Sequence, residues 1–432
     1  MTNTEPTPND STLDDLQELE FALSKTLFDN FDTGYYIGMM SGTSLDGMDA
    51  VICQFDESDN ERIIATHTKP FPEYLRDTLL ALCQPNGITN LAHPVKNIIL
   101  EQQPHSELEW FGWASREYAE FASTVVNELL QQSGISADDI LAIGCHGQTV
   151  RHRPKLGFSL QLVDPNVIAE RTGISVVTDF RRRDMAVGGQ GAPLAPAFHL
   201  AQFADATQSD KDLIVVNLGG IANITVLPAK QADKVIGYDT GPANILLDAW
   251  YQNHHPDATT LYDDAGQWAQ SGTVNSELLA QFMAHPYFGQ NAPKSTGREE
   301  FNLGWLTQQL EQFSLETKQT VDAASVQATL TQLTSQSLCE AIQIETDRLS
   351  LQPGNLIVCG GGAYNPNLID QIAKQLPHWQ VATSQEFGVS PTWVEAMAFA
   401  WLARQTIMGE TGNLPAVTGA SKAVVLGQVC FA

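Results

Sequence analysis

Two pairs of short apolar runs stand out along the chain, and each pair predicts a β-hairpin. The first pair spans residues 35–40 and 48–55 and encloses the polar first loop, SGTSLDG (residues 41–47). The second pair spans residues 213–216 and 221–227 and encloses the second loop, NLGG (residues 217–220). Strand-forming runs on either side of a short loop with glycine are typical of hairpins. The pattern therefore predicts one hairpin in each half of the chain.

Helical periodicity predicts longer elements between and after the hairpins. The expected helices lie near residues 107–132, 243–253, 272–285, 300–313, 325–349 and 390–405. The last should open at Ser390-Pro391, because proline is favoured at the first helical position. Further strands are predicted at residues 140–145, 174–177 and 356–359. Strands that alternate with helices in this way indicate an α/β protein with mixed sheets.

The length of 432 residues suits two domains, each with its own core. We expect residues 35–181 together with about 410–432 to form domain 1, and residues 182–409 to form domain 2. Residues 1–34 form an N-terminal extension whose first ten residues are polar and predicted to be disordered. Leucines from Leu13 to Leu27 then recur at helical spacing, which predicts an amphipathic helix. Its expected role is packing on domain 1, with a partner contact as the alternative.

Charge and cysteine usage narrow the function classes. The net charge of −27 argues against nucleic acid and against an anionic membrane surface as partners. Any anion site must therefore be locally positive or built from backbone N–H groups. The six cysteines are scattered without a C-x-x-C pair, so neither a zinc site nor a disulfide framework is indicated. With no secretory signal and no apolar run of about 20 residues, the expected location is the cytoplasm.

The first loop carries the groups that a nucleotide polyphosphate and its metal need. Glycines allow backbone N–H groups to approach an anion, hydroxyls add donors, and carboxylates can hold a divalent cation. The loop residues are Gly42 and Gly47, Thr43 and Ser44, and Asp46, and Asp49 follows just after the loop. The loop is not a Walker A motif, because it contains no lysine. The alternative is a polar surface hairpin without a ligand.

Two further motifs offer groups suited to an anionic sugar. His146, Gln148 and Thr149 follow the strand at 140–145, where neutral hydrogen-bonding groups suit sugar hydroxyls or an amide. Three consecutive arginines, Arg181, Arg182 and Arg183, follow the strand at 174–177. Arginine binds carboxylates and phosphates through paired hydrogen bonds, and Arg181 is the first choice to face an anionic substrate group. The alternatives are a polar turn at His146 and ion pairs of the arginines with Asp179 and Asp184.

The second half of the chain supplies a candidate base and several loops. Asp239 lies in YDTGPAN at a predicted strand end and could accept a proton from water or a hydroxyl, although Asp-Thr-Gly is also a good helix cap. The loop PKSTGRE (residues 293–299) could contact a phosphate or cap a helix. Gly360, Gly361 and Gly362 could let adenine or ribose lie against the backbone, or could form a flexible turn. Glu395 is a lone acid on an apolar helix; it could reach a ligand cleft or lie at its edge with its hydrogen bonds satisfied, and we favour the second position.

Seven motifs, in this order, resemble those of the anhydro-N-acetylmuramic acid kinases. They are SGTSLDGMD, GCHGQTVRH, DFRRRD with GGQGAPL, NLGGIANIT, YDTGPAN, PKSTGRE and CGGGAYN, and they span residues 41–365. The first loop by itself resembles the phosphate hairpin of the actin, sugar-kinase and heat-shock ATPase superfamily, which uses one such hairpin in each domain. Departures are modest: the extension at residues 1–34, a long segment near residues 86–105, and Ala243 where the family usually has glycine.

The resemblance implies a fold, an activity and a set of site residues. The fold is the two-domain actin-like ATPase (ribonuclease H-like) fold, with nucleotide bound in the interdomain cleft. The enzyme would use ATP and Mg²⁺ to hydrolyse the anhydro ring of 1,6-anhydro-N-acetylmuramic acid and phosphorylate O6, giving N-acetylmuramate 6-phosphate during peptidoglycan recycling. Members are generally cytoplasmic homodimers. Asp239 is the implied catalytic residue, and His146, Gln148, Thr149 and Arg181 are assigned to the sugar.

The implied ATP site draws on three segments. Its residues are Gly42, Thr43, Ser44, Leu45, Asp46, Gly47, Met48, Asp49, Gly219, Gly220, Gly360, Gly361 and Gly362, with Asp46 as the metal ligand. Two rival functions stay open at this point. One is a plain sugar or carboxylate kinase of the same fold, which would add no water to its product. The other is a non-catalytic ATP-driven switch, which the lack of an obvious peptide-binding region after residue 405 disfavours.

Overall fold

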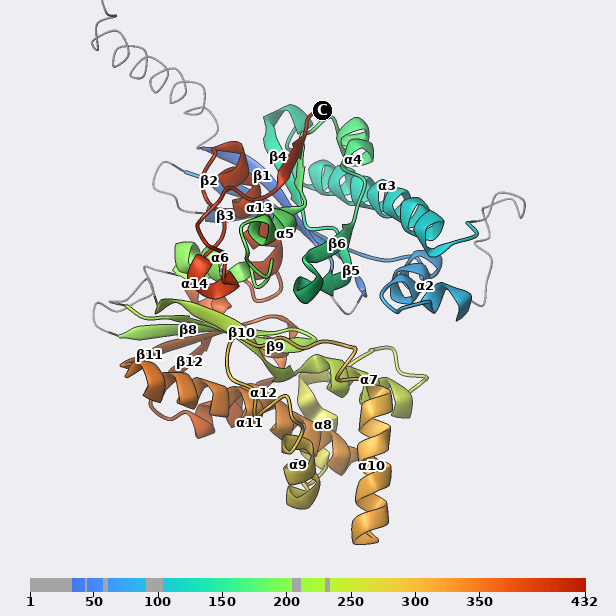
Figure 1. Ribbon diagram of the computed structural model, residues 1–432, viewed down its shortest axis with the longest axis vertical. Helices are drawn as coiled ribbons and strands as arrows, with labels where there is room; N and C mark the ends of the chain where they lie inside the picture. The colour runs from blue at the N-terminus through green and yellow to red at the C-terminus, as the bar shows by residue number, and fades with distance from the viewer. Residues whose placement is uncertain (1–32, 43–44, 57–60, 91–103, 204–210, 230–233) are drawn as a thin grey trace, which may run out of the picture.

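The computed structural model describes residues 33–42, 45–56, 61–90, 104–203, 211–229 and 234–432. The predicted N-terminal helix and disordered start, together with Thr43 and Ser44 of the first loop, lie outside these residues. Within them, no helix is both long enough and apolar enough to cross a membrane. The molecule consists of two bodies stacked along its long axis, each built around one main sheet (Figure 1).

The first main sheet has six strands. In spatial order they are β13 (Gln428–Cys430), β7 (Val176–Thr178), β4 (Ile140–Cys145), β1 (Gly34–Met40), β2 (Gly47–Phe55) and β3 (Glu61–Pro70). β1, β2 and β3 are antiparallel neighbours, whereas β4 lies parallel to β1 and β7 parallel to β4. The chain end returns as β13 to pair with β7. β5 (Gln148–Arg153) and β6 (Phe158–Leu162) form a separate two-stranded sheet.

The second main sheet repeats the connection order of the first. Its strands are β10 (Ile236–Pro242), β9 (Ile221–Leu227), β8 (Asp212–Leu218), β11 (Pro353–Cys359) and β12 (Gln380–Thr383). β8, β9 and β10 are antiparallel, and β11 and β12 follow in parallel on the other side of β8. In each sheet the first strand therefore lies between its second and fourth. This repeated order is that of the ribonuclease H-like fold, and the predicted α/β fold class with mixed sheets is confirmed.

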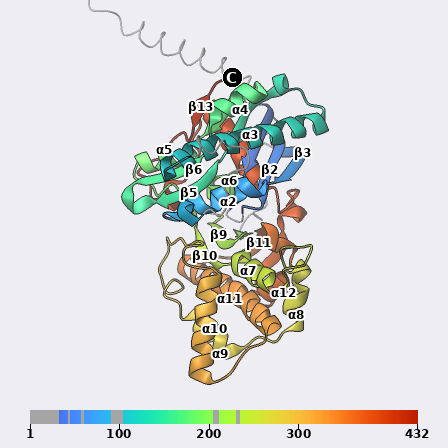
Figure 2. The ribbon, with the colours of Figure 1, turned by 90° about the vertical axis from the view of Figure 1, so that its right-hand side faces the viewer.

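Helices cover the outer faces of both sheets, as the two perpendicular views show (Figures 1 and 2). α3 (Glu107–Ser133) packs on β2 and β3, and α11 (Ala323–Leu349) packs on β9 and β10. The predicted helices near 107–132, 243–253, 272–285, 300–313 and 325–349 are confirmed as α3, α7 (Asn244–His254), α9 (Ser276–Met283), α10 (Leu303–Thr317) and α11. Apart from α13, the other α-helices in the described residues are α2 (Glu73–Leu82), α4 (Pro165–Thr172), α5 (Phe180–Ala186), α6 (Ala195–Phe203), α8 (Gln267–Ser271), α12 (Pro366–Gln375) and α14 (Pro415–Thr418).

The predicted opening of the last long helix at Ser390-Pro391 is wrong. α13 runs over Val394–Ile407, and Trp393 is its N-cap residue. The Trp393 N–H donates to the Ser390 carbonyl, and the Pro391 carbonyl accepts from the Gly360 N–H at 3.0 Å. Pro391 therefore lies in a turn of its own, three residues before the helix begins, and its carbonyl is bonded to Gly360.

α13 packs closely on the inner face of the six-stranded sheet. A Cβ on Gly38 would lie 1.9 Å from the Ala396 carbonyl oxygen, and one on Gly144 would lie 1.9 Å from that of Phe399. Only glycine on β1 and β4 allows this approach. The core around α13 continues into residues of β8 and β11, so it joins the two sheets. The proposed domain boundaries stay a prediction, although α13, placed in domain 2, contacts the six-stranded sheet.

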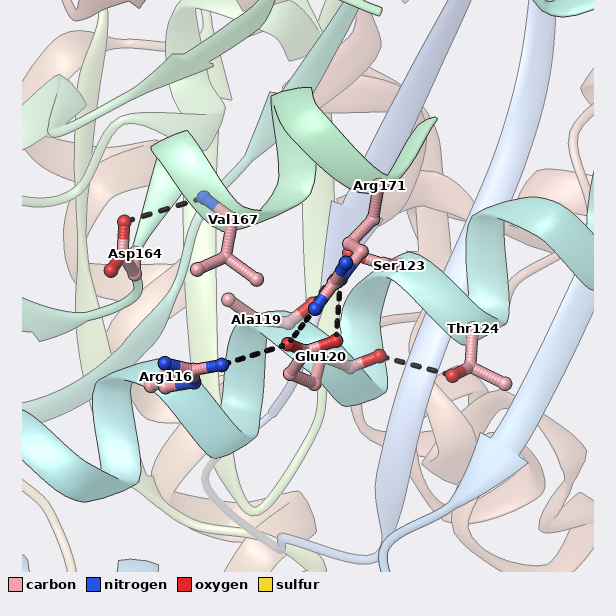
Figure 3. A network of polar contacts seen from close by, with 8 residues as sticks. All are labelled: Arg116, Ala119, Glu120, Ser123, Thr124, Asp164, Val167 and Arg171. Atoms are coloured by element: carbon pink, nitrogen blue, oxygen red, sulfur yellow. Dashed lines mark hydrogen bonds and ion pairs between the residues drawn. The ribbon is translucent and has the colours of Figure 1, made fainter. Parts of the chain in front are cut away.

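A surface network links α3 to α4 (Figure 3). Glu120 accepts hydrogen bonds from Arg171 at 2.9 and 3.1 Å and lies 3.6 Å from Arg116. Asp164 caps α4 by accepting from the Asn166 and Val167 N–H groups. Because Arg116 and Arg171 are exposed and Glu120 is partly exposed, we expect the network to contribute little to the stability of the fold.

Candidate active site

Asp239 lies on β10, where the backbone is irregular and tied to a neighbouring loop. The pairing with β9 shifts register between Asp239 and Gly241. The Asp239 N–H donates to the Lys294 carbonyl at 3.2 Å, and its carbonyl accepts from the Tyr287 hydroxyl at 2.5 Å. Its carboxylate oxygen Oδ2 accepts from the Thr296 N–H at 3.1 Å. The loop containing Lys294 and Thr296 thus fixes both the backbone and the side chain of Asp239.

The surroundings of Asp239 suit a base. Its pKa is raised from the usual value of 3.8 to about 6, mainly by burial; the Thr296 N–H opposes this and the charge of Glu299 adds to it. A general base is most effective when its pKa lies near the working pH. The capping alternative is not what the structure shows, because α7 has Ala243 as its N-cap residue and no side-chain cap. Thr240 instead donates to the Ala222 carbonyl of β9.

The first loop divides its side chains between the core and the surface. Leu45 and Met48 are 1% and 0% exposed and belong to the core beneath α3, so a nucleotide could reach only their backbone. Leu45 has a φ of 58°, in the left-handed region, which a tight turn requires. A Cβ on Gly47 would lie 2.5 Å from the Lys69 carbonyl oxygen, so this glycine is needed for packing on β3. Asp46 is exposed at the loop surface.

Carboxylates from both halves of the chain approach the first loop. Burial is the main cause that raises the pKa of Asp49 and, to about 7, that of Asp248 on α7; the charge of Asp46 raises both further. Asp49 also accepts from the Thr68 hydroxyl at 2.6 Å. In the described parts of the chain no three His, Cys, Asp or Glu side chains are close enough to hold a metal by themselves. Mg²⁺ typically uses one or two carboxylates with water and phosphate oxygens, so Asp46 fits that role.

The second loop docks on the N-terminus of α7 through its carbonyl groups. The Gly220 carbonyl accepts from the N–H groups of Ala243 and Ile245, each at 3.0 Å. The Gly219 carbonyl accepts from the Asn244 N–H at 3.0 Å. These bonds satisfy the first donors of α7 and hold the second loop rigidly. A Cβ on Gly219 would lie 3.6 Å from its nearest atom, an ordinary van der Waals distance, so packing alone does not require glycine there.

The glycine cluster after β11 packs against the end of β8. Gly360 has a φ of 80°, and a Cβ there would lie 2.3 Å from the Asn217 Oδ1 atom. A Cβ on Gly362 would lie 2.6 Å from the Leu218 Cβ atom. Gly360 and Gly362 are therefore required by packing, whatever binds nearby. Gly361 is the least crowded of the three glycines, because the nearest atom to a Cβ there would be 3.6 Å away. Of the three, Gly361 therefore fits the predicted adenosine contact best.

His146 and Arg181 form one unit. The Arg181 guanidinium donates to His146 Nε2 at 2.8 and 3.1 Å and to the Gly191 carbonyl at 2.9 Å. Burial, with the charge of Arg181, lowers the pKa of His146 well below its usual value, so the imidazole is neutral. Since Nε2 accepts, Nδ1 carries the hydrogen, and this buried Nδ1 atom has no partner. A buried donor without a partner fits a ligand oxygen.

Gln148 is tied to Ser41 of the first loop, whereas Thr149 is held within the β5–β6 pair. The Ser41 hydroxyl donates to Gln148 Oε1 at 2.8 Å and lies 2.9 Å from the Tyr118 hydroxyl. Gln148 is 3% exposed, so it connects β5 to the first loop. Thr149 accepts from the Gln161 amide at 2.9 Å across the β5–β6 pair. Their predicted role in sugar binding stays a prediction.

The other two arginines differ from Arg181. Arg182 is exposed and pairs with Asp179, as the ion-pair alternative expects. Arg183 is also exposed. Asp184 is fully buried and accepts hydrogen bonds from Gly191, Asn413 and Thr418. Arg181, the first choice from the sequence, is thus the arginine that lies beside His146.

Two site residues were not assigned a definite role from the sequence. Asp248 was not predicted from the sequence. It is a lone acid between Leu247 and Trp250, which are both buried, and an acid in such an apolar stretch could have marked it as a candidate site residue. Arg298 was seen only as part of the 293–299 loop. Glu395 accepts from the Asn217 amide at 3.2 Å, in agreement with the favoured interpretation that it is satisfied.

A cavity of about 480 Å³ lies behind β10, between α11 and the 288–294 loop. Tyr238 and Thr240, the neighbours of Asp239 on β10, line it together with Lys294 and Glu345. Because successive strand residues point to opposite faces, this cavity lies on the other face of β10 from the Asp239 side chain.

The chain matches known proteins over almost its whole length. The family model for anhydro-N-acetylmuramic acid kinase matches residues 34–432. A protein of that name from Psychrobacter cryohalolentis is 58% identical over 441 residues, covering 97% of this chain and all of the relative. One from Psychrobacter arcticus is 56% identical over 450 residues with the same coverage, and one from Shewanella sediminis is 46% identical over 400 residues, covering 92% and 99%. The chain belongs to the anhydro-N-acetylmuramic acid kinase family.

Proposed function

We propose that this protein uses ATP to open 1,6-anhydro-N-acetylmuramic acid with water and to phosphorylate O6, producing N-acetylmuramate 6-phosphate and ADP. Family membership supports the reaction. The observation that carries the mechanism is Asp239, a fixed carboxylate with its pKa raised to about 6. The same strand order in both halves places one hairpin in each, which is the arrangement proposed to bind ATP.

Asp239 acts as the base. It removes a proton from a water molecule that attacks the anomeric carbon, C1, and the C1–O6 bond breaks. The freed O6 attacks the γ-phosphorus of ATP, and the bond to the bridging oxygen of ADP breaks. This resembles an inverting glycosidase, in which a carboxylate activates water. A separate general acid is unnecessary, because the leaving oxygen passes to phosphorus instead of taking a proton.

Two loops provide the ATP site. Backbone N–H groups of the first loop (Gly42 to Asp49 in the motif) and of Gly219 and Gly220 approach the phosphates, and Gly361 leaves room for adenosine. Asp46 would hold Mg²⁺, which supplies charge neutralisation at the β- and γ-phosphates. The buried side chains of Leu45 and Met48 anchor the end of this loop in the core, which favours a preorganised site.

The sugar lies beside the His146–Arg181 unit. The unpartnered Nδ1–H of His146 donates to a sugar or acetamido oxygen. Arg181 supplies the positive charge that the lactyl carboxylate needs in a protein of net charge −27. Gln148 orients Ser41 of the first loop, so the sugar and ATP sites share a wall.

The protein acts as a cytoplasmic homodimer in peptidoglycan recycling.

Mass spectrometry in heavy-oxygen water tests the reaction. The protein is incubated with 1,6-anhydro-N-acetylmuramic acid, ATP and Mg²⁺, and the sugar product is analysed. One heavy oxygen at C1 together with one phosphate supports the proposal. A phosphorylated sugar with an intact anhydro ring would instead show a plain sugar kinase, and ADP formation without any sugar product would favour the switch.

The Asp239→Asn variant tests the base. It should bind ATP and sugar but turn over at least about 10²-fold more slowly, the low end for loss of a general base. Turnover near that of the unmodified protein would remove Asp239 from this role. Activity in excess chelator would remove Mg²⁺ from the proposal.

A further inference from the structure

Arg298 follows closely on the residue that holds the Asp239 side chain. Thr296 donates its N–H to Asp239, and two residues later the Arg298 carbonyl accepts from the Asn302 amide at 2.9 Å. The Gly297 carbonyl accepts from the next turn of backbone at 3.0 and 3.1 Å. The backbone at Arg298 is thus fixed on both sides, and its position is coupled to that of Asp239.

The Arg298 side chain is half-buried, and the charge of Asp46 in the first loop acts on it. Its Nε atom is buried and has no hydrogen-bond partner. Burial lowers the pKa of the guanidinium, and the charges of Cys83, Asp46 and Asp248 oppose this shift. A buried guanidinium donor without an acceptor is unfavourable, so a ligand acceptor is expected at this point.

We propose that Arg298 binds the terminal phosphoryl group of ATP and stabilises it while it passes to O6. Three observations favour this ligand over the sugar carboxylate. The charge of Asp46, the carboxylate assigned to the metal, acts on Arg298, whereas Arg181 already donates to His146. Its donor is free, and its planar fork matches phosphate oxygens. Its loop also carries the donor to Asp239, so the two reacting centres share one support.

The role of Arg298 is electrostatic. As the O6–phosphorus bond forms and the bond to the ADP oxygen breaks, the electron pair leaves with ADP. Arg298 donates N–H groups to the phosphoryl oxygens throughout, and no proton is transferred. Arginines in this role contribute about 10³–10⁵ to kcat in other phosphoryl-transfer enzymes. The proposal rests on the proposed ATP-dependent function and adds the residue that recognises the transferred group.

Nucleotide binding tests the proposal without relying on turnover. Calorimetry compares ADP with the non-hydrolysable analogue AMP-PNP, each with Mg²⁺, because only the analogue carries the terminal group. Arg298→Met should bind AMP-PNP about 10–100-fold more weakly, the loss expected for a charged hydrogen bond. Its ADP affinity should change less than about threefold, and kcat should fall about 10³-fold. Arg171→Met, which removes an exposed arginine on α4, is the matched control and should change each value less than about twofold.

Two outcomes would overturn the proposal. Equal weakening of ADP and AMP-PNP would mean that Arg298 supports the site generally, and a kcat within about tenfold of the unmodified protein would mean that it does not stabilise the transfer. If Arg298→Met unfolds, Arg298→Lys replaces it. This variant should keep most of its affinity for AMP-PNP, because lysine keeps the positive charge, but its kcat should fall, because lysine lacks the planar guanidinium. If the unmodified protein makes no phosphorylated sugar, the proposed function fails, while the ADP and AMP-PNP comparison still tests Arg298.

Discussion

Lowering the pH from 7 to 5 should slow this enzyme about tenfold, because Asp239 must be ionised to act as a base. With its pKa raised to about 6, Asp239 is about 90% ionised at pH 7 and about 10% ionised at pH 5. An aspartate at its usual value of 3.8 would still be more than about 90% ionised at pH 5, so its rate would barely change. The size of the fall in rate on the acidic side of the pH profile, called the acidic limb below, therefore reports how far burial has raised the pKa of this carboxyl.

The assay is kcat/KM for the anhydro sugar at saturating ATP, measured from pH 4.5 to 8.5. This ratio reports the ionisation of the free enzyme, which the structure represents. Asp248 has a pKa raised to about 7 and could produce a similar limb. The Asp248→Asn variant separates the two, since the limb near pH 6 should survive in it.

A second variant moves the limb in a known direction. The charge of Glu299 raises the pKa of Asp239, so Glu299→Gln should shift the limb to lower pH. Profiles that stay flat down to pH 5, or a limb that vanishes in Asp248→Asn, would refute the assignment of the raised pKa to a catalytic Asp239. A limb that does not move in Glu299→Gln would refute the electrostatic part of the reasoning.

Three further predictions concern stability. Asp239→Asn should be more stable than the unmodified protein at pH 8, by up to about 3 kcal/mol in the free energy of unfolding, because the raised pKa of Asp239 means that its ionised form destabilises the fold. This gain in thermal unfolding should fade as the pH drops below 6 and be absent below about 4. Gly38→Ala should lose at least about 3 kcal/mol in a thermal unfolding assay, since its Cβ would overlap the Ala396 carbonyl, whereas Gly112→Ala on α3, with open space, should gain about 0.5–1 kcal/mol; equal effects would contradict the packing argument. Glu120→Gln should change stability by less than about 1 kcal/mol, and a larger loss would show that the exposed network matters more than its solvent exposure suggests.

The sequence pattern predicted the secondary structure correctly where an element depends mainly on the residues of its own segment. The two hairpins, the long helices α3 and α11 and the α/β class followed from periodicity and turn residues. The start of α13 did not, because the Pro391 carbonyl is used by Gly360, a residue from a distant part of the chain. A proline rule describes only its own segment and contains no information about that partner.

The sequence by itself determined the family, the pair of hairpins and the types of residue at the candidate site. Only the tertiary structure decided how these residues act on one another. It brought Thr296 to Asp239 and Arg181 to His146, and it placed Arg298 where the charge of Asp46 acts on it. Burial and the charges of neighbours set a pKa or leave a donor unpartnered, and both depend on contacts between residues far apart in the chain. For this reason the identity of the candidate base could be predicted from its motif, whereas its pKa and the unpartnered Arg298 donor could not.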